Sequence, residues 1–450
     1  MRLAHRQSRR ARCVVAASLD DLGGRLARQQ AGTMSPKTAH SNAPHVIFVA
    51  PFFLEATVRF VRAVASLPGV NVTLIHQDSR ERLDGDVKRM LHDAVAIPNA
   101  LDAQQIADAV RVLVGRHGPC HRLLATLEQL QEPVAEVRRA LGISGHGPQT
   151  ATNFRDKGRM KEVLGAAGLP VARHAKVTTL EAARAFVAKV GLPVVVKPPA
   201  GAGSVATWRC DTDDALVAAV TAAHVSAARP VQVEEFVQGL ERSFEVISIA
   251  GRPLFSSLCW YDPRPLEVLQ QPWVQWTVTL PREINDPAYD DVRRVGFAAL
   301  KALGMQTGIS HMEWFRKHDG AVMINEIAAR PPGANIIRLN SLAFERDFFD
   351  TWADVVVNER LDPPEQHWAA GAAFLRGQGK IGGRVMRIHG LDDAQKQIGR
   401  YVVDSRLPAL GTPQSSSYEG EGWVLVRART TEEVQSALRV IIGTVRVELG

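Results

Sequence analysis

The sequence is poor in cysteine and lacks long apolar runs. Its four cysteines, Cys13, Cys120, Cys210 and Cys259, lie far apart and form no CxxC pair. This spacing argues against a disulfide framework and against a zinc site, and it fits a reducing cytoplasm. No apolar run approaches the roughly 18 residues that a membrane-spanning helix needs. We therefore expect a cytoplasmic protein that does not enter a membrane.

An excess of basic charge is confined to one end of the chain. The formal net charge is +7, but residues 1–37 hold eight arginines and lysines against two aspartates, which leaves about +1 for the rest. A basic face for nucleic acid is therefore not supported. Residues 1–43 form a basic tail with three interpretations: an Arg-rich leader, a basic arm, or translated sequence upstream of a start at Met34. We favour the third, and expect the tail to be disordered or to lie outside the native protein.

From residue 44 to residue 145, apolar runs alternate with helical segments. VIFVA at 46–50 is a continuous apolar run, as expected for a parallel strand that is buried on both faces, and a second strand-like segment, NVTLI, follows at 71–75. The alternation predicts an open parallel sheet of Rossmann type. No GxGxxG motif follows the first run, so we expect a scaffold or a substrate platform rather than a dinucleotide site.

The next segment lacks the Walker pattern GxxxxGK[ST] but carries another loop of small residues. Residues 150–168 predict one helix. Downstream, the β-branched run VVVK ends in Lys197 and leads into the loop, after which a strand resumes. The loop contains Gly201, Gly203 and Ser204. Such a flap can close its backbone N–H groups on phosphate oxygens, although most glycine-rich hairpins are plain turns.

Residues 311–330, HMEWFRKHDGAVMINEIAAR, predict a β-hairpin. Asp319-Gly320 suits the two central positions of a type I′ turn, and a two-residue loop there places Glu313 opposite Glu326. Opposed like charges destabilise a hairpin, so the pair indicates a cation between the two carboxylates. Carboxylates of this kind usually hold Mg²⁺ beside a phosphate chain. The alternative is an exposed strand face on which both acids are solvated.

Four motifs follow one another in a characteristic order. They are RDKGRMKEVLGAAGLPV, VVVKPPAGAGS, EEFVQGLE, and HMEWF followed by INEIAARPPG. In these motifs the chain, from about His45 to its C-terminus, resembles the carboxylate–amine ligases of the ATP-grasp superfamily. Each motif alone is weak, whereas four in order are specific. The resemblance implies a mixed α/β and α+β fold: an N-terminal Rossmann-like parallel sheet, a central ATP-grasp fold of two α+β subdomains, and a small strand-rich C-terminal domain.

The expected domain boundaries follow from this comparison and from the composition. We expect a first domain at 44–145, an ATP-grasp domain at 146–360 with a flap subdomain at about 170–240, and a C-terminal domain at 361–450, which begins in the Pro-rich stretch LDPPEQHW. Residues 253–280 are rich in tryptophan. Those aromatic residues either pack in the core or form a wall of the substrate pocket.

The resemblance implies that the protein uses ATP with Mg²⁺, and Mn²⁺ is the alternative metal. Positively charged side chains would neutralise the phosphates as the γ-phosphoryl group moves. The implied positions are Lys157 and Lys197 at the phosphates, Gly201, Gly203 and Ser204 over them, Glu234 and Val237 at the adenine edge, Glu241 at the ribose, and Glu313 and Glu326 at the metal ion.

Two further residues are candidate catalytic residues. Arg330 shares strand parity with Glu326, so its guanidinium could hold an acyl phosphate or a substrate carboxylate. His311 shares parity with Glu313 and could also face the site. A core or surface histidine is the alternative for His311.

One position departs from the family pattern. Family members commonly carry an asparagine two residues after the second metal-binding glutamate, and Ala328 stands there in this chain. Asn325 precedes Glu326 directly, but strand parity directs it to the opposite face. Whether the site holds one or two metal ions therefore stays open.

The sequence thus predicts an ATP-dependent ligase that forms an amide or peptide bond through an acyl phosphate and releases ADP and phosphate. Its partners would be a small carboxylic acid and an amine, with amino acids as the expected pair, and a homodimer is common for this resemblance. One alternative is a biotin carboxylase-like or purine-pathway carboxylating enzyme, although no RLQVEHPVTE-type segment or MKM site occurs. Another is a non-catalytic nucleotide-binding module, which Ala328 supports.

Overall fold

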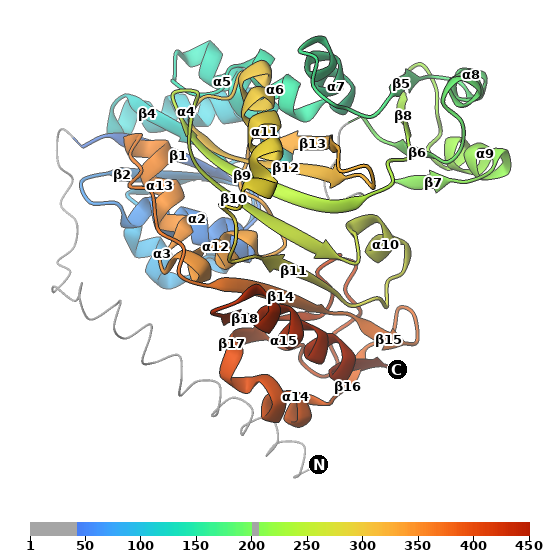
Figure 1. The fold of residues 1–450 in the computed structure, drawn as a ribbon. Coiled ribbons are helices and arrows are strands. Elements are labelled where there is room, and N and C mark those ends of the chain that lie inside the picture. The colour runs from blue at the N-terminus through green and yellow to red at the C-terminus, as the bar shows by residue number, and fades with distance from the viewer. Residues whose placement is uncertain (1–42, 200–206) are drawn as a thin grey trace.

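A computed structural model describes residues 43–199 and 207–450 of the chain, and its fold is drawn in Figure 1. Residues 1–42 of the predicted tail, and the flap residues Gly201, Gly203 and Ser204, lie outside the described residues. Among the helices that are described, none combines the length and the apolar character that crossing a bilayer requires.

The N-terminal unit is the predicted parallel sheet of Rossmann type. Its strands run in the order β3-β2-β1-β4, and β1 is buried along its whole length. Alternate residues of β1 belong to two different apolar clusters, one with α2 and the other with α4 and α5, because helices cover both faces of the sheet. The elements are β1 (His45–Ala50), α2 (Glu55–Ser66), β2 (Asn71–His76), α3 (Gly85–Met90), β3 (Asp93–Ala96), α4 (Ala103–His117), β4 (Cys120–Leu124) and α5 (Gln131–Leu141).

The single helix predicted over 150–168 is wrong, because two helices occupy this segment. They are α6 (Pro148–Arg155) and α7 (Lys157–Ala166). The break lies at Asp156, whose side chain accepts a hydrogen bond from Arg159 N at 2.9 Å. An aspartate in that position satisfies free N–H groups at a helix start, so a new helix begins at Lys157.

The flap subdomain is a small sheet with its own apolar core. Its strands run in the order β5-β8-β6-β7, with antiparallel pairing throughout. Two helices pack on this sheet through an apolar cluster that is separate from the other cores. The elements are β5 (His174–Val177), α8 (Leu180–Val190), β6 (Val194–Lys197), β7 (Trp208–Cys210), α9 (Asp213–Ala222) and β8 (Val231–Glu235).

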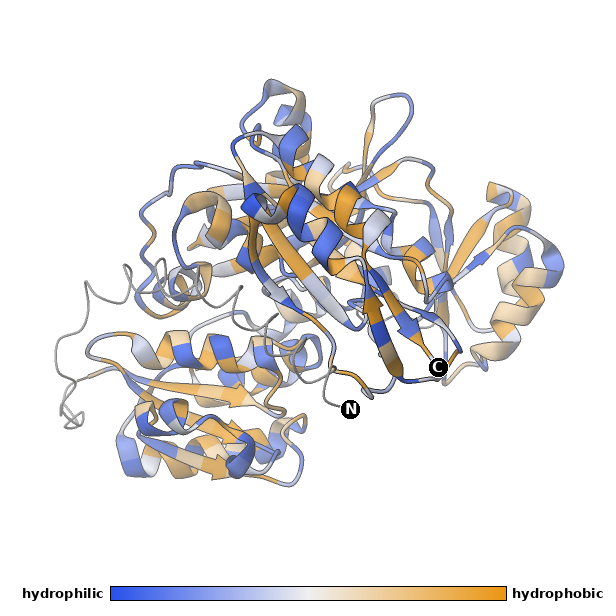
Figure 2. Ribbon diagram, turned by 90° about the horizontal axis from the view of Figure 1, so that it is seen from below, coloured by the Kyte–Doolittle hydropathy of each residue, from blue (hydrophilic) through white to orange (hydrophobic). Residues whose placement is uncertain are grey.

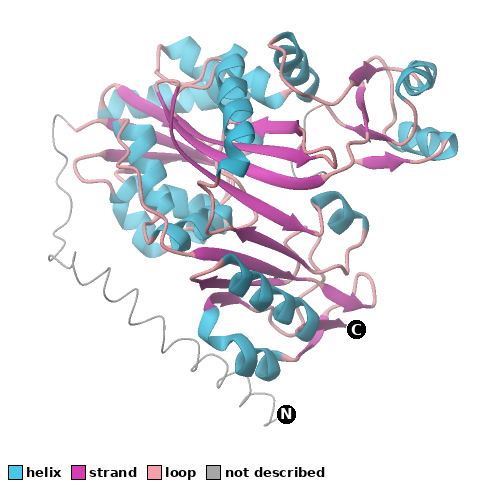
Figure 3. Ribbon diagram, viewed as in Figure 1, coloured by secondary structure: helices cyan, strands magenta, loops and turns pink. Residues whose placement is uncertain are grey.

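A large antiparallel sheet joins the central and C-terminal parts of the chain. In its order, β13-β12-β9-β10-β11-β14-β18-β17, the last three strands come from beyond residue 361. Figure 3 shows these strands as one continuous surface, with α11 across one face. The elements are β9 (Leu240–Ile249), β10 (Arg252–Asp262), α10 (Pro265–Gln270), β11 (Trp276–Leu280), α11 (Asp290–Leu303), β12 (Gly308–Arg316), β13 (Val322–Ala328), α12 (Ile336–Phe344), α13 (Phe348–Asn358), β14 (Ala369–Leu375), β17 (Val402–Arg406) and β18 (Gly422–Ala428).

The C-terminal end adds a second apolar cluster to this sheet. Strand β19 pairs with β15 and β16, and α15 packs on β14 and β18. Helix α15 starts at a capping box, in which Thr430 and Glu433 satisfy each other's backbone N–H groups. The elements are β15 (Gly377–Gly379), β16 (Val385–His389), α14 (Leu391–Ile398), α15 (Thr431–Thr444) and β19 (Arg446–Leu449).

Apolar contacts connect the first sheet to the rest of the molecule. Phe60 of α2 and Phe349 of α13 lie with their ring centroids 4.7 Å apart, and Trp352 adds an edge contact to Phe60 at 4.8 Å. In Figure 2 the strands are predominantly orange, while the helices alternate orange with blue. That pattern is typical of sheets covered by amphipathic helices.

Candidate active site

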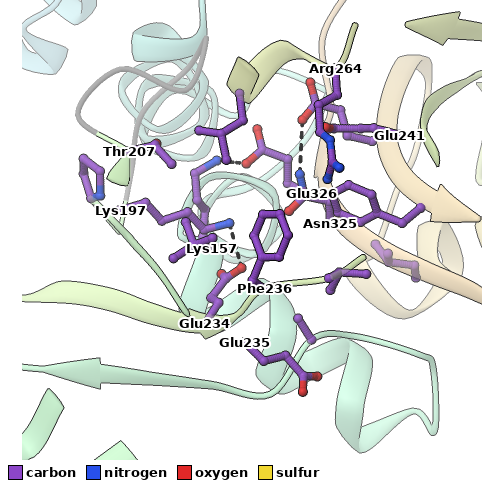
Figure 4. Close-up of a pocket in the computed structure, with 18 residues that line it drawn as sticks. Lys157, Lys197, Thr207, Glu234, Glu235, Phe236, Glu241, Arg264, Asn325 and Glu326 are labelled. Carbon is purple, nitrogen blue, oxygen red and sulfur yellow. Dashed lines mark hydrogen bonds and ion pairs between the residues drawn. The ribbon is translucent and has the colours of Figure 1, made fainter. Parts of the chain in front are cut away.

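One pocket lies between the flap subdomain and the large sheet (Figure 4). It is lined by the start of α7, by β6 and β8, by the segment that connects β8 to β9, and by the hairpin of β12 and β13. The fold therefore brings together side chains from stretches that lie far apart in the sequence. The predicted residues that line the pocket are Lys157, Lys197, Glu234, Val237, Glu241, Glu313 and Glu326.

The hairpin places the two metal-binding candidates opposite each other, as predicted. Glu313 of β12 pairs with Glu326 of β13. The predicted two-residue loop is wrong, however, because Lys317 N donates to Ala321 O at 2.9 Å and closes a three-residue loop. Its last residue, Gly320, adopts a φ of +81°, which glycine reaches without strain. The longer loop alone would have shifted the register by one residue.

A β-bulge restores that register. The pairing runs from Trp314 with Ile324 directly to Glu313 with Glu326, so that Asn325 is the extra residue on β13. The prediction that Asn325 faces away from the site is wrong, because strand parity fails at a bulge. Asn325 lines the pocket, and its Nδ2 donates to Glu313 Oε2 at 3.4 Å.

Lysines balance the acidic groups of the pocket. Lys157 forms an ion pair with Glu326, and Lys197 Nζ lies 2.9 Å from Glu234 Oε2. Burial opposes ionisation of Glu326, yet the positive charges of Lys157 and Lys197 outweigh it and lower its pKa to about 2. Glu326 is therefore held in the charged form that binds a cation.

Lys161 lies behind the pocket, in contact with two residues that line it, and the sequence predictions missed it. Its Nζ lies 3.3 Å from Glu234 Oε2 and donates to Asn325 O at 3.0 Å. Burial lowers the pKa of Lys161 to about 8, although Glu234 opposes this. Its spacing of four residues from Lys157, on one helix face, is the signal that could have revealed it.

The opposite end of the pocket surrounds Glu241. Burial raises the pKa of Glu241 to about 8, and the nearby carboxylate of Glu313 adds to that effect. Two lining residues there were not predicted: Phe236, in the connection between β8 and β9, and Arg264, which precedes α10. The guanidinium of Arg209 lies 4.2 Å from the Phe236 ring centroid. Phe236 lies within the EEFVQGLE motif, which could have revealed it, whereas no motif marks Arg264.

The tryptophans of 253–280 divide between core and surface. Trp276 is buried and stacks on Phe374 with ring centroids 4.5 Å apart, whereas Trp273 is exposed. The two interpretations were a packed core and a substrate wall. Trp276 is part of the packed core. Among the described residues, this segment contributes Arg264 and Leu266 to the lining of the pocket.

His311 lies on the same face as Glu313, as its parity predicts. Its Nδ1 lies 2.9 Å from Glu245 Oε1, and its Nε2 lies 3.7 Å from Glu313 Oε1. Burial disfavours the imidazolium, but hydrogen bonds to both carboxylates raise the pKa of His311 to about 9. A catalytic role for His311 stays a prediction.

Arg330 has a different environment from the one predicted. Strand β13 ends at Ala328, so the parity argument does not extend to Arg330. Its Nε donates to Glu128, which follows β4 of the first domain and also pairs with Arg155 at 3.4 Å. Arg330 is absent from the described residues that line the pocket. Contact with an acyl phosphate or a substrate carboxylate stays a prediction.

A model of the ATP-grasp domain family matches residues 162–341. That span contains Lys197, Glu234, Glu241 and both carboxylates of the hairpin. Residues 162–341 of this chain form an ATP-grasp domain. Outside the matched span, α7 begins at Lys157, and the C-terminal strands extend the ATP-grasp sheet.

Known ligases resemble the chain in sequence and in fold. The L-arginine-specific L-amino acid ligase of Bacillus subtilis is 25% identical over 245 residues, which cover 53% of this chain and 58% of that protein. The chain thus spans little more than half the length of this relative. The L-amino acid ligase from Bacillus licheniformis has a TM-score of 0.72 at 18% identity, over 92% of this chain and 100% of that one. The N5-carboxyaminoimidazole ribonucleotide synthetase from Thermotoga maritima has a TM-score of 0.65 at 19% identity, over 90% and 100%. These two structures show a shared fold.

The donors of this ATP-grasp pocket fit a hard cation. Glu313 and Glu326 supply carboxylate oxygens, and the Asn325 amide lies beside them. Among the described residues, no group of three or more His, Cys, Asp or Glu side chains forms a self-contained metal site. Two protein carboxylates, completed by phosphate oxygens and water, are the usual surroundings of Mg²⁺ at a nucleotide.

Proposed function

We propose that this protein is an ATP-dependent ligase that joins a carboxylic acid to an amine through an acyl phosphate. The observation that supports it best is the pocket itself, in which Lys157 and Lys197 face the paired carboxylates of Glu313 and Glu326. This arrangement suits the transfer of a phosphoryl group, because positive charge surrounds the position where negative charge develops. The similarity to the L-arginine-specific L-amino acid ligase of Bacillus subtilis supports amino acids as the acid and the amine.

Nucleotide binding would replace the ion-pair partners of the two pocket lysines. In the structure Lys157 pairs with Glu326, and Lys197 pairs with Glu234. When nucleotide enters, the lysines would turn to its phosphates, and Glu326 and Glu313 would hold Mg²⁺. A bound Mg²⁺ neutralises phosphate charge and polarises the γ-phosphoryl group. Phosphate and metal are thus expected to bind together, since either alone leaves a buried charge without a partner.

The reaction then proceeds in two displacements. A carboxylate oxygen of the acid attacks the γ-phosphorus, the bond to the bridging oxygen of ADP breaks, and an acyl phosphate forms. The amine nitrogen, after losing its ammonium proton, attacks the acyl carbon and expels phosphate. The amide loses a second proton, so the products are amide, ADP and phosphate. Lys157 and Lys197 stabilise the migrating charge, and the closed pocket excludes water, which would hydrolyse the acyl phosphate.

A screen for ADP and phosphate release tests the proposal. The purified protein would be incubated with ATP, Mg²⁺ and pairs drawn from amino acids and small carboxylic acids. Release that requires both an acid and an amine supports the ligase, and hydroxylamine in place of the amine should trap the acyl group as a hydroxamate. No ADP release with any pair, from a folded protein that binds ADP, would instead support the nucleotide-binding module.

The same screen addresses the carboxylating alternative. The fold likeness to N5-carboxyaminoimidazole ribonucleotide synthetase favours including bicarbonate as the acid. ADP release that depends on bicarbonate and on no other acid would replace the amide-forming proposal with a carboxylating one.

A further inference from the structure

Lys161 is a buried lysine that the proposed chemistry does not use. Its side chain is fully enclosed, with an exposed fraction of 0%. Among the described residues that line the pocket, Lys157 and Lys197 are present and Lys161 is absent. A lysine that binds phosphate has to reach the ligand, so Lys161 has a different task. Its partners show what that task is.

The backbone oxygen that Lys161 holds belongs to the bulge in β13. This strand forms one edge of the large sheet. Its outward backbone groups are met by the segment that follows α7, where Ile324 N donates to Pro170 O at 2.8 Å, and by side chains of α7 itself. Lys161 Nζ donates to Asn325 O at 3.0 Å, and Met160 Sδ accepts a hydrogen bond from Ile327 N at 3.2 Å. Helix α7 therefore holds β13 on both sides of Glu326.

The bulge determines where the Asn325 side chain lies. In a regular strand Asn325 would face away from Glu326, whereas here it lines the pocket and donates to Glu313 Oε2 at 3.4 Å. The amide group also carries an oxygen, which is a hard ligand of the kind that Mg²⁺ takes. Ala328, which stands at the family's usual asparagine position, offers no such group.

We propose that Lys161 is a positioning residue of the cation site, and that Asn325 is the third protein ligand of that site beside Glu313 and Glu326. By holding Asn325 O, Lys161 keeps the extra residue of β13 in the bulge, and the bulge turns the Asn325 amide toward the carboxylates. The inference rests on the proposed function only in taking a nucleotide with Mg²⁺ as the ligand of the pocket. It does not depend on which acid or amine reacts.

Calorimetry of ADP binding tests the proposal without any turnover. ADP affinity would be measured with Mg²⁺ and in the presence of a chelator, for the full chain and for Asn325→Ala, Lys161→Met and the double variant. Each single change should weaken binding about tenfold with Mg²⁺, as loss of a metal-supporting contact does, and leave binding without Mg²⁺ nearly unchanged. The double variant should be no weaker than the single ones, because both changes remove one shared arrangement. A chain without ligase activity would still answer this question.

Matched controls separate this effect from a general loss of charge or amide groups. Lys189→Met, at an exposed position of α8, and Asn358→Ala, at the end of α13, should leave both affinities unchanged. The change Ala328→Asn restores an asparagine at the family's usual position. Combined with Asn325→Ala, it should recover most of the Mg²⁺-dependent affinity for ADP.

Three results would overturn the proposal. An equal loss of ADP affinity with and without Mg²⁺ in Lys161→Met would mean that Lys161 acts on the nucleotide. An unchanged Mg²⁺ effect in Asn325→Ala would mean that the amide is not a ligand. If neither Lys161→Met nor Lys161→Gln, which keeps an N–H donor, shows a cooperative melting transition, Lys161 serves the fold and its assignment to the cation site fails.

Discussion

At the scale of single residues, the pocket is organised by pairs of buried, oppositely charged side chains. Glu326 pairs with Lys157, and Glu234 lies between Lys161 and Lys197. Removing one member of such a pair leaves the other without compensation, which destabilises a buried site strongly. Variants of these residues should therefore keep the shape of the side chain and change only its charge.

Glu326→Gln is the most direct test of the metal site at this scale. It keeps the size of the side chain but removes the negative charge, so Mg²⁺-dependent ADP formation should fall by roughly a hundredfold or more, as for other losses of transition-state charge stabilisation. Steady-state rates across a Mg²⁺ titration would measure this. Glu162→Gln, at an exposed position of α7, is the control and should keep the full rate. Equal rates for the Glu326 variant and the control would contradict the assignment of Glu326 to the metal.

At the scale of elements, the metal hairpin shows how two local errors in prediction can cancel. The loop contains one residue more than Asp319-Gly320 suggests, and β13 contains one extra residue at Asn325, so Glu313 still meets Glu326. The pairing was predicted from the register of an Asp319-Gly320 turn, and it holds only because the two errors cancel. The bulge was not predictable, because its backbone is held by α7, which lies more than 150 residues earlier in the chain and packs along the edge of β13.

Helix α11 packs closely against the sheet that contains the same hairpin. A Cβ added at Gly296 would lie 2.7 Å from Phe244 and 3.3 Å from Met312, so the helix packs closely because a glycine stands there. Gly296→Val should lower the free energy of unfolding by about 1–3 kcal/mol, the usual effect of overpacking a core. Denaturant unfolding would measure the change.

Gly115→Ala in α4 is the matched control for Gly296. Nothing lies within 4 Å of a Cβ at that position, so the substitution should be neutral or stabilise the helix by up to about 1 kcal/mol. If both variants lose stability to the same extent, close packing of α11 on the sheet is not the cause.

At the scale of the whole molecule, polar contacts as well as apolar ones connect the first sheet to the ATP-grasp sheet. Arg330 reaches Glu128 of the first domain. His146, in the segment that connects α5 to α6, accepts a hydrogen bond from Gln306 N at 3.2 Å and stacks on Phe154. Only a neutral imidazole can accept that hydrogen bond.

His146 should make the folded protein sensitive to acid. Burial lowers the pKa of His146 from its ordinary 6.5 to about 4, and the positive charge of Arg138 adds to the effect. Because the folded-state pKa is depressed, the unfolded chain takes up the proton first as pH falls. The contribution of His146 is therefore present above pH 6.5 and is lost as pH falls toward 4. Between pH 7 and pH 5 it should amount to about 2 kcal/mol or less.

Unfolding free energies of the wild type and of His146→Gln at pH 7 and pH 5 would measure this contribution. The variant should show a smaller loss on acidification than the wild type, since carboxylates contribute equally to both. His318→Gln, at the exposed tip of the hairpin, should retain the wild-type difference. Identical losses for the wild type and His146→Gln would show that His146 does not control the acid response.

The sequence by itself determined the elements whose signals are local. Apolar runs predicted the parallel sheet, the β-branched run VVVK predicted the strand that ends in Lys197, and the Asp319-Gly320 turn predicted that Glu313 pairs with Glu326. These predictions depend on residues that are neighbours in the chain, where period and parity hold. Only the tertiary structure decided that Asn325 faces the pocket, that Lys161 holds its backbone, and that Arg330 contacts Glu128. The reason is physical: each of these contacts joins segments far apart in sequence, and the spacing of residues along one strand carries no information about the helix or domain that packs against it.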